Sequence, residues 1–143
     1  MKPVLVDTDI LSLFFRDNHN VVSNFKNYLA RHEKINLSII TYYEILSGLK
    51  HRDALKQLDS FLEFAKHNAI LPLTEESIMI SSDLYANLRK AGKTIDDIDI
   101  LIAGVALSNN LVLVTNNEAH FKNIEELEIL NWSKSEAASH KTG

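Results

Sequence analysis

The sequence predicts an α/β domain with a mostly parallel central sheet, because short apolar strands alternate with helices along the chain. The clearest unit spans residues 95–121. Its helix, around Ile98–Leu107, is apolar almost all round, which is typical of a helix buried on every side. Asn109 and Asn110 supply turn chemistry, and the following run Leu111–Val114 has the pattern of a strand buried on both faces.

The remaining elements follow the same alternation. Further strands are expected at residues 3–6, 35–39, 70–73 and 128–132. The third of these should lie at or near an edge of the sheet, because it contains Pro72. Further helices are expected at residues 10–15, 21–29, 41–48, 54–64 and 75–88. Thr8 or Asp9 can be the N-cap of the first helix, and Thr41 is expected to open the third.

Composition limits the class of protein. The length of 143 residues suits one domain, which we assign to residues 1–132. The small, polar residues 133–143 are expected to form a disordered tail. Cysteine is absent, which excludes disulfides and thiolate metal sites. With no signal peptide and no apolar run long enough to cross a membrane, we expect a cytoplasmic location without membrane contact. The net charge of -4 argues against purely electrostatic nucleic-acid binding, but permits binding through a cation.

Four oxygen-bearing side chains are predicted to meet at one edge of the sheet. Asp7 ends the first strand, and Glu44 lies early in the helix after the second. Asp99 lies early in the buried helix, and Asn117 follows the next strand. In an open α/β sheet, ligands bind beyond the carboxyl ends of the strands. Three carboxylates and an amide suit Mg²⁺ or Mn²⁺, whereas zinc prefers nitrogen and sulfur ligands.

Each of the four also has a purely structural interpretation. Asp7 and Asn117 could be turn residues. Glu44 could close a capping box with Thr41. Asp99 could be an anion at a helix N-terminus, paired with a cap and stabilised by the helix dipole, although this does not explain three acids within four residues.

Other polar groups are less informative. His120 is expected on the surface, and the six histidines show no pairing that is typical of acid–base nuclease chemistry. The basic groups at residues 49–52 and 89–93 are expected to be solvated helix ends, although they could also hold an RNA backbone.

Four short motifs occur in order along the chain. They are VLVDT at residues 4–8, T-x-x-E-I-x-x-G at 41–48, D-I-L-I-A-G at 99–104 and L-V-T-N-N-x-x-x-F at 113–121. In this order and spacing they resemble the PIN-domain ribonucleases, and more narrowly the VapC toxins of type II toxin–antitoxin pairs. The resemblance extends from residue 3 to Trp132.

The resemblance implies a three-layer α/β/α sandwich and Mg²⁺-dependent endoribonuclease activity on structured RNA, often a tRNA. It also implies a homodimer and a cognate antitoxin protein that blocks the site. The metal-binding acids of the family correspond to Asp7, Glu44 and Asp99. Two positions depart from the family pattern. Asp9 stands where the family often has Asn, and Asn117 occupies the fourth acidic position of many PIN domains, keeping an oxygen ligand but not its charge.

These residues predict a hydrolytic mechanism. A cation held by Asp7 and Asp99 can polarise a phosphoryl oxygen and lower the pKa of the attacking water. Glu44 either completes the metal shell or accepts the proton of that water. Because no ribose 2′-OH takes part, the products should carry 5′-phosphate and 3′-OH ends.

Parts of the sequence also suggest two other functions. The segment Asp7-Thr8-Asp9 resembles the nucleophile motif of haloacid-dehalogenase-type phosphohydrolases, but the acidic pair of that class should follow its second motif, and here residues 96–97 precede 112–115. A PIN-like binding module without catalysis would predict the loss of acids, for which Asn117 is the only sign. Mutation of Asp7 distinguishes a binding module from an enzyme, because a binding module should keep its function.

Overall fold

The computed structural model describes residues 1–134, and it confirms the α/β class with a parallel sheet. Five strands lie in the order β3-β2-β1-β4-β5, and every neighbouring pair is parallel. β3 is an edge strand, as Pro72 predicted. The strands are β1 (Val4–Val6), β2 (Asn36–Ser38), β3 (Ala69–Leu71), β4 (Val112–Val114) and β5 (Ile129–Leu130).

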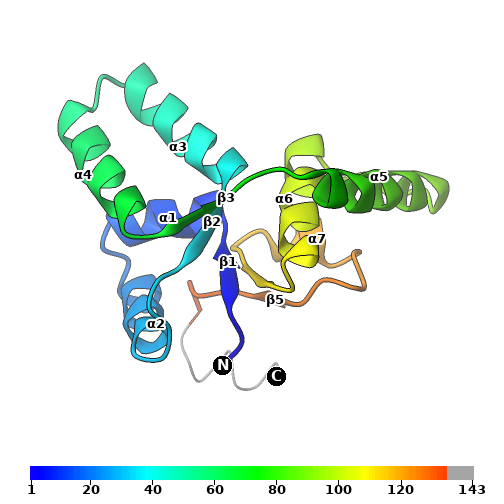
Figure 1. The fold of residues 1–143 in the computed structure, drawn as a ribbon, viewed down its shortest axis with the longest axis horizontal. Helices are drawn as coiled ribbons and strands as arrows, with labels where there is room; N and C mark the ends of the chain where they lie inside the picture. Colours follow the sequence, from blue (N-terminus) through cyan, green and yellow to red (C-terminus); the bar gives the residue numbers. More distant parts are fainter. Residues whose placement is uncertain (135–143) are drawn as a thin grey trace.

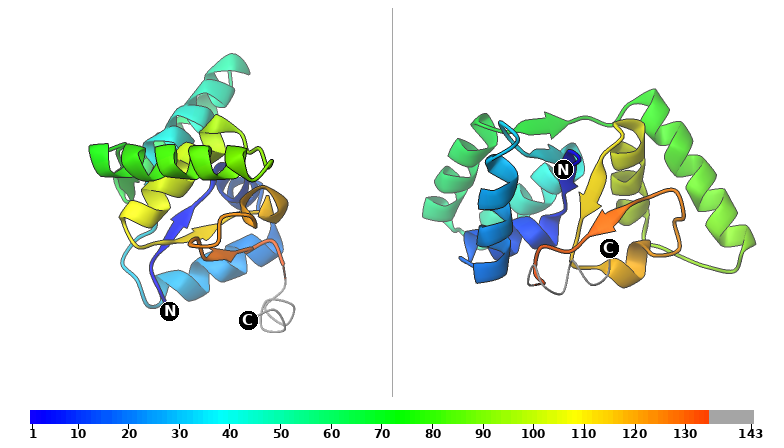
Figure 2. Two further views of the ribbon diagram at one scale, coloured as in Figure 1. Left: turned by 90° about the vertical axis from the view of Figure 1, so that its right-hand side faces the viewer. Right: turned by 90° about the horizontal axis from the view of Figure 1, so that it is seen from below.

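Helices cover both faces of the sheet and make three layers (Figures 1 and 2). On one side lie α1 (Thr8–Phe15), α2 (His19–Leu29), α3 (Ile39–His51) and α4 (Leu55–Lys66). On the other lie α5 (Glu75–Lys90), α6 (Asp97–Ser108) and the short α7 (Glu118–Phe121), which the sequence did not predict. No helix among residues 1–134 is long and apolar enough to cross a membrane.

Two apolar cores separate these layers, and β1 contributes to both. Val4 and Val6 belong to the core beneath α1–α4, whereas Leu5 belongs to the core beneath α5–α7. β4 alternates in the same way, with Leu113 facing the second core. This explains why both strands are continuous apolar runs, since every position of each strand is buried.

Gly104 allows α5 and α6 to pack closely. A Cβ atom at this position would lie 2.6 Å from the backbone oxygen of Ser77 and even closer to the side chain of Ser81. The Ser81 hydroxyl instead donates a hydrogen bond of 2.9 Å to the backbone oxygen of Ile100. The absence of a side chain at residue 104 therefore fixes α6, and with it Asp99, against α5.

Several helix boundaries differ from the prediction, among them three in α1 and α3. Asp7, not Thr8 or Asp9, is the N-cap of α1. α3 begins at Ile39 rather than Thr41, because Ser38 caps it by accepting a hydrogen bond of 3.0 Å from the Thr41 amide. In both cases the polar residue at the end of a strand starts the helix directly, without a loop. α3 also continues past residue 48, to His51.

The end of the described chain is tied to the rest of the domain. The backbone oxygen of Ser133 accepts a hydrogen bond of 2.9 Å from the Asn20 side chain, and Lys134 pairs with Glu118. The other residues of the predicted tail, 135–143, lie outside the described part.

Candidate functional site

The acidic residues gather where the chain order of the sheet reverses. From β1, the chain builds β2 and β3 on one side and later β4 and β5 on the other. Such a switch point leaves a crevice beyond the carboxyl ends of the two central strands. Asp7 stands at this point, directly after β1, and its backbone amide donates a hydrogen bond of 2.9 Å to Val114 at the end of β4.

Asp7 is buried, with only 4% of its surface exposed, and its side chain is fixed on both oxygens. Oδ1 accepts a hydrogen bond of 2.8 Å from the backbone amide of Thr8. Oδ2 accepts one of 2.8 Å from the hydroxyl of Thr115. Burial, and then the negative charge of Asp9, raise the pKa of Asp7 from 3.8 to about 7, although both hydrogen bonds oppose the increase. The charged form of Asp7 is therefore disfavoured in the folded protein.

Asp9 is a second carboxylate of the site, and sequence reasoning did not select it. Oδ2 accepts a hydrogen bond of 3.0 Å from the backbone amide of Asn116. Oδ1 is buried and has no hydrogen-bond partner among the described residues. Burial is the main reason that the pKa of Asp9 is raised, and the charge of Asp99 adds to it. The available signal was its position: Asp9 lies two residues after the strand-ending Asp7, in the first turn of α1.

Asp99 is the one acid of its group that is turned inward. Its side chain is 14% exposed, whereas Asp96 and Asp97 are exposed. Asp96 is the N-cap of α6, but its side chain makes no capping hydrogen bond. Asp99 Oδ2 instead lies 2.9 Å from His120 Nδ1. His120 is on the surface as predicted, yet its ring contacts this carboxylate, which nothing in the local sequence indicates.

Glu44 joins the site through a threonine. Its Oε1 accepts a hydrogen bond of 2.7 Å from the Thr8 hydroxyl, which is also 3.0 Å from the hydroxyl of Thr41. The capping-box interpretation of Glu44 is wrong, because α3 begins at Ile39 and Glu44 therefore lies in the second turn. The hydrogen bond to α1, not a helix cap, holds this carboxylate.

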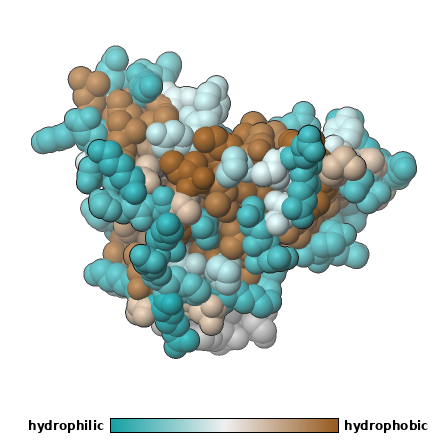
Figure 3. Space-filling view, viewed as in Figure 1, coloured by the Kyte–Doolittle hydropathy of each residue, from teal (hydrophilic) through white to brown (hydrophobic). Residues whose placement is uncertain are grey.

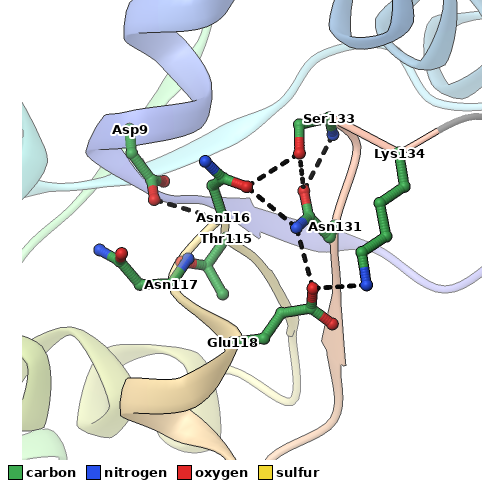
Figure 4. Close-up of polar contacts among 8 residues, drawn as sticks. All are labelled: Asp9, Thr115, Asn116, Asn117, Glu118, Asn131, Ser133 and Lys134. Carbon is green, nitrogen blue, oxygen red and sulfur yellow. Dashed lines mark hydrogen bonds and ion pairs between the residues drawn. The ribbon is translucent and has the colours of Figure 1, made fainter.

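Asn117 lies at the rim, on the loop after β4. Its backbone amide donates a hydrogen bond of 3.0 Å to the same Thr115 hydroxyl that holds Asp7. Its side chain makes no capping hydrogen bond to α7, and Figure 4 shows it directed away from the polar network around Asn131. The structure therefore connects Asn117 to Asp7 through Thr115, but its amide does not contact the carboxylates.

A polar network anchors this loop from behind (Figure 4). The Asn131 amide donates to Asn116 Oδ1 at 3.1 Å and to Glu118 Oε2 at 3.0 Å. Lys134 Nζ lies 2.8 Å from the same Glu118 oxygen. The hydrogen bond from Asn131, followed by the contact with Lys134, lowers the pKa of Glu118. The loop is therefore held by the residues after β5, which keeps the Asn116 amide in place for Asp9.

The donor set fits a hard divalent cation. The charges of Asp9 and Asp99 both act on Asp7, so three carboxylates share one negative field. Among residues 1–134, no group of three or more acidic, histidine or cysteine side chains is placed to hold a metal ion. Mg²⁺ does not require one, since it commonly keeps several waters and binds through one or two carboxylates. The unpaired Asp9 Oδ1 and the raised pKa of Asp7 are two features that a bound cation would relieve.

Comparison with known proteins identifies relatives over nearly the whole chain. The family model of the PIN domain matches residues 4–127. Ribonuclease VapC1 of Methanocaldococcus jannaschii is 31% identical over 92% of this chain and 88% of its own, and Ribonuclease VapC1 of Haemophilus influenzae strain R2866 is 28% identical over 91% and 98%. The tRNA(fMet)-specific endonuclease VapC of Shigella flexneri is 24% identical over 93% and 100%.

Solved structures give the same result. VapBC2 from Rickettsia felis, bound to a DNA fragment from its promoter, contains a chain that superposes with a TM-score of 0.80 at 28% identity, covering 90% of this chain and 98% of that one. DNA-bound VapBC from Salmonella typhimurium gives a TM-score of 0.81 at 25% identity, with coverage of 92% and 99%.

Proposed function

The chain belongs to the PIN-domain family and, within it, to the VapC ribonucleases, and from this membership we propose that it is the toxin of a type II toxin–antitoxin pair, a Mg²⁺-dependent endoribonuclease that cleaves structured RNA. The observation that carries the proposal is the convergence of Asp7, Asp9 and Asp99 at the switch point of the sheet. Family membership removes the haloacid-dehalogenase alternative. A tRNA is the substrate class that we propose, because a relative from Shigella flexneri is a tRNA(fMet)-specific endonuclease.

We propose that Asp7, Asp99 and Glu44 hold the cation, with Asp9 as an additional carboxylate and Mn²⁺ as a substitute ion. A bound Mg²⁺ would polarise a phosphoryl oxygen and lower the pKa of the attacking water. The chain's own side chains supply the rest. Asp7 is held by two hydrogen bonds, and Asp99 by His120, so neither carboxylate needs to reorganise.

Glu44 is the side chain that we propose to take a proton from the attacking water, if it does not contact the cation directly. The Thr8 hydroxyl orients Glu44 Oε1, and Thr8 is itself the residue after Asp7. Asn117 is proposed to contact the substrate or a water at the rim. Transfer of the proton to a carboxylate leaves the ribose 2′-OH unused, so the products should carry 5′-phosphate and 3′-OH ends.

The test is cleavage of a purified tRNA pool in Mg²⁺, in Mn²⁺ and in EDTA, followed by analysis of the fragment ends. Asp7→Asn should abolish cleavage, and Asp83→Asn, which changes an exposed acid on α5, should not. Cleavage that persists in EDTA, or 2′,3′-cyclic phosphate ends, would exclude metal-dependent hydrolysis. If the parent protein does not cleave and Asp7→Asn remains toxic in cells, the chain is a binding module.

We also propose a cognate antitoxin that inserts an arginine or lysine into the acidic site. Either side chain would neutralise the carboxylates that attract the metal, and an arginine could bind one of them in a bidentate way. The solved relatives of Rickettsia felis and Salmonella typhimurium are toxin–antitoxin complexes. Expression in a heterologous cytoplasm, where the substrate RNA resides, should be harmful alone and tolerated together with the product of the adjacent gene. Harmless expression of the intact chain, at a confirmed protein level, would count against a toxin.

A homodimer is the third part of the proposal. Apolar side chains are exposed on the face between α3 and α5, where Figure 3 shows hydrophobic surface bordered by hydrophilic groups. They include Ile39, Tyr43, Leu73, Ile78 and Met79. Such a patch is typical of a protein–protein interface. Met79→Glu should convert the dimer into a monomer, as measured by light scattering.

A further inference from the structure

A pocket opens from the acidic site into the space between α1, α3 and α4. Its volume is about 540 Å³. At one end it is lined by Thr8 and Glu44, which belong to the site, and farther along by three cationic side chains, Arg16, Arg52 and Lys56. The pocket therefore reaches Glu44 of the site, but most of the charged side chains that line it are positive.

The two facing helices present their residues to this pocket in the same order. On α1 the lining residues Thr8, Ser12 and Arg16 are spaced four apart, and so lie along one face of the helix. On α3 the residues Glu44, Gly48 and Arg52 repeat this spacing. Eight residues of helix span about 12 Å. Each helix therefore carries a site residue, a small residue that leaves room, and an arginine about 12 Å away.

Gly48 shows where the Arg52 side chain lies. A Cβ atom at residue 48 would be 3.5 Å from Arg52 Nη1, so the guanidinium of this exposed residue lies back along α3, beside Gly48. Ser12 is the small residue at the matching position of α1. Small residues on both helices thus leave space in the middle of the pocket, and an arginine stands at its far end on each side.

These cations are available to a ligand. Among residues 1–134, none of the three forms an ion pair, and neither Asp17 nor Asp53, which follow the two arginines, lines the pocket. Arg16 and Arg52 follow the C-termini of α1 and α3, where the helix dipole favours a cation. Lys56 lies in the first turn of α4, where the dipole disfavours one, so helix stability does not account for the set.

An aromatic ring completes the pocket. Phe15 lines it, is 40% exposed, and lies edge-on to Phe61, with ring centroids 5.9 Å apart. A groove that combines unpaired cations with an exposed aromatic ring is typical of single-stranded nucleic-acid binding, in which phosphates meet the cations and bases stack on the ring. The pocket thus gathers three cations in a chain whose net charge is -4.

We propose that this pocket binds the RNA strand next to the scissile bond, with Arg16, Arg52 and Lys56 contacting phosphates and Phe15 stacking a base. The inference rests on the proposed nuclease function and specifies how its substrate is held. A peptide that carries an arginine into the acidic site is the other possible occupant, and the test distinguishes it from RNA. An unpaired, extended nucleotide fits, since its phosphate and its base match the two kinds of lining.

The test compares Arg16→Gln/Arg52→Gln with the parent and with Arg31→Gln, an exposed arginine outside the pocket. Binding of a short fluorescein-labelled single-stranded RNA is measured in EDTA over a salt series, and cleavage of the tRNA pool is measured in Mg²⁺. Each lost phosphate contact should reduce the slope of log K against log salt by about 0.7, hence by about 1.4 for the double variant. KM should increase about tenfold or more while kcat stays near that of the parent, and Arg31→Gln should match the parent in both assays.

Equal slopes and equal KM values for the double variant and the parent would overturn the proposal. It would also be overturned if the double variant kept both RNA parameters and lost only its inhibition by the antitoxin, since the pocket would then be a protein-binding surface. A parent that binds RNA with the expected slope but cleaves nothing would refute the nuclease function and leave the pocket assignment supported. A thermal melt of each variant checks that the fold is retained.

Discussion

Asp7→Asn should stabilise the protein in EDTA above neutral pH, although it removes a central residue of the site. The pKa of Asp7 is raised from 3.8 to about 7, so the charged form is disfavoured in the folded state. At about 1.4 kcal/mol per pKa unit, the penalty is about 4 kcal/mol. This penalty is absent below pH 3.8, grows as the pH rises between the two pKa values, and is complete above about pH 7.

The substitution also has a cost. Asparagine can still cap α1 by accepting from the Thr8 amide, but the Thr115 hydroxyl loses an ionised acceptor, which costs about 1 kcal/mol. The net gain at pH 8 is therefore about 2–3 kcal/mol. For a chain of this size, that corresponds to a rise in Tm of about 6–10 °C.

Thermal scans of both proteins in EDTA at pH 8 and near pH 4 provide the assay. The variant should melt higher at pH 8 and at or below the parent near pH 4, so the difference changes sign. Asp83→Asn, at an exposed position, should differ from the parent by no more than about 0.5 kcal/mol at either pH. If Asp7→Asn melts lower than the parent at pH 8 by as much as it does near pH 4, burial does not penalise this carboxylate and the reasoning fails.

Three further predictions concern the site and its support. Asp99→Asn should lower the rate of RNA cleavage at least about 100-fold, which corresponds to about 2.7 kcal/mol of activation free energy, whereas Asn117→Ala should lower it about tenfold. Similar losses for both variants in a cleavage assay would make Asn117 an equal member of the site. In thermal scans at pH 8, a hundredfold excess of Mg²⁺ over its Kd should stabilise the parent by about 2.7 kcal/mol and should stabilise Asp99→Asn much less. Gly104→Ala should destabilise the fold by at least about 1–3 kcal/mol in urea unfolding, because its Cβ meets the Ser77 backbone. Gly48→Ala, whose Cβ would have its nearest neighbour 3.5 Å away, should be neutral or slightly stabilising. Equal effects of the two substitutions would contradict the packing argument.

The fold was predictable from the sequence because burial determines the pattern of its strands. β1 and β4 are buried on both faces, and three consecutive apolar residues in each reveal this directly. α6 was recognised for the same reason, since six of its residues are buried. The short α7 was missed because its four residues are too few to show helical periodicity. Helix starts were misplaced where a polar strand end, such as Ser38, also serves as the cap.

The site was predictable only as far as strand ends and helix starts place residues. Asp7 and Asp99 follow from that rule, and each lies where it was expected. The contacts that position them do not, because they join residues far apart in the chain: Thr115 to Asp7, Thr8 to Glu44, and His120 to Asp99. Threonine and histidine are common on surfaces, so nothing in their local sequence marks these three as partners of carboxylates.

Asp9 shows why a site can carry more charge than its own fold tolerates. The resemblance in sequence leads us to expect asparagine at this position, and the charge of Asp9 is the second-largest cause of the raised pKa of Asp7, after burial. An amide at residue 9 would remove that repulsion and could still accept the Asn116 hydrogen bond, so the fold alone favours asparagine. For the divalent cation that we propose, the carboxylate would supply a further negative oxygen, and Oδ1 is a buried oxygen without a hydrogen-bond partner among the described residues. Because a cation that binds only the folded state stabilises that state, the charge that weakens the metal-free protein would strengthen a metal-bound one. The carboxylates at the ends of the two central strands thus reduce the stability of the metal-free fold. This property distinguishes the edge of the sheet that carries them from the rest of the scaffold.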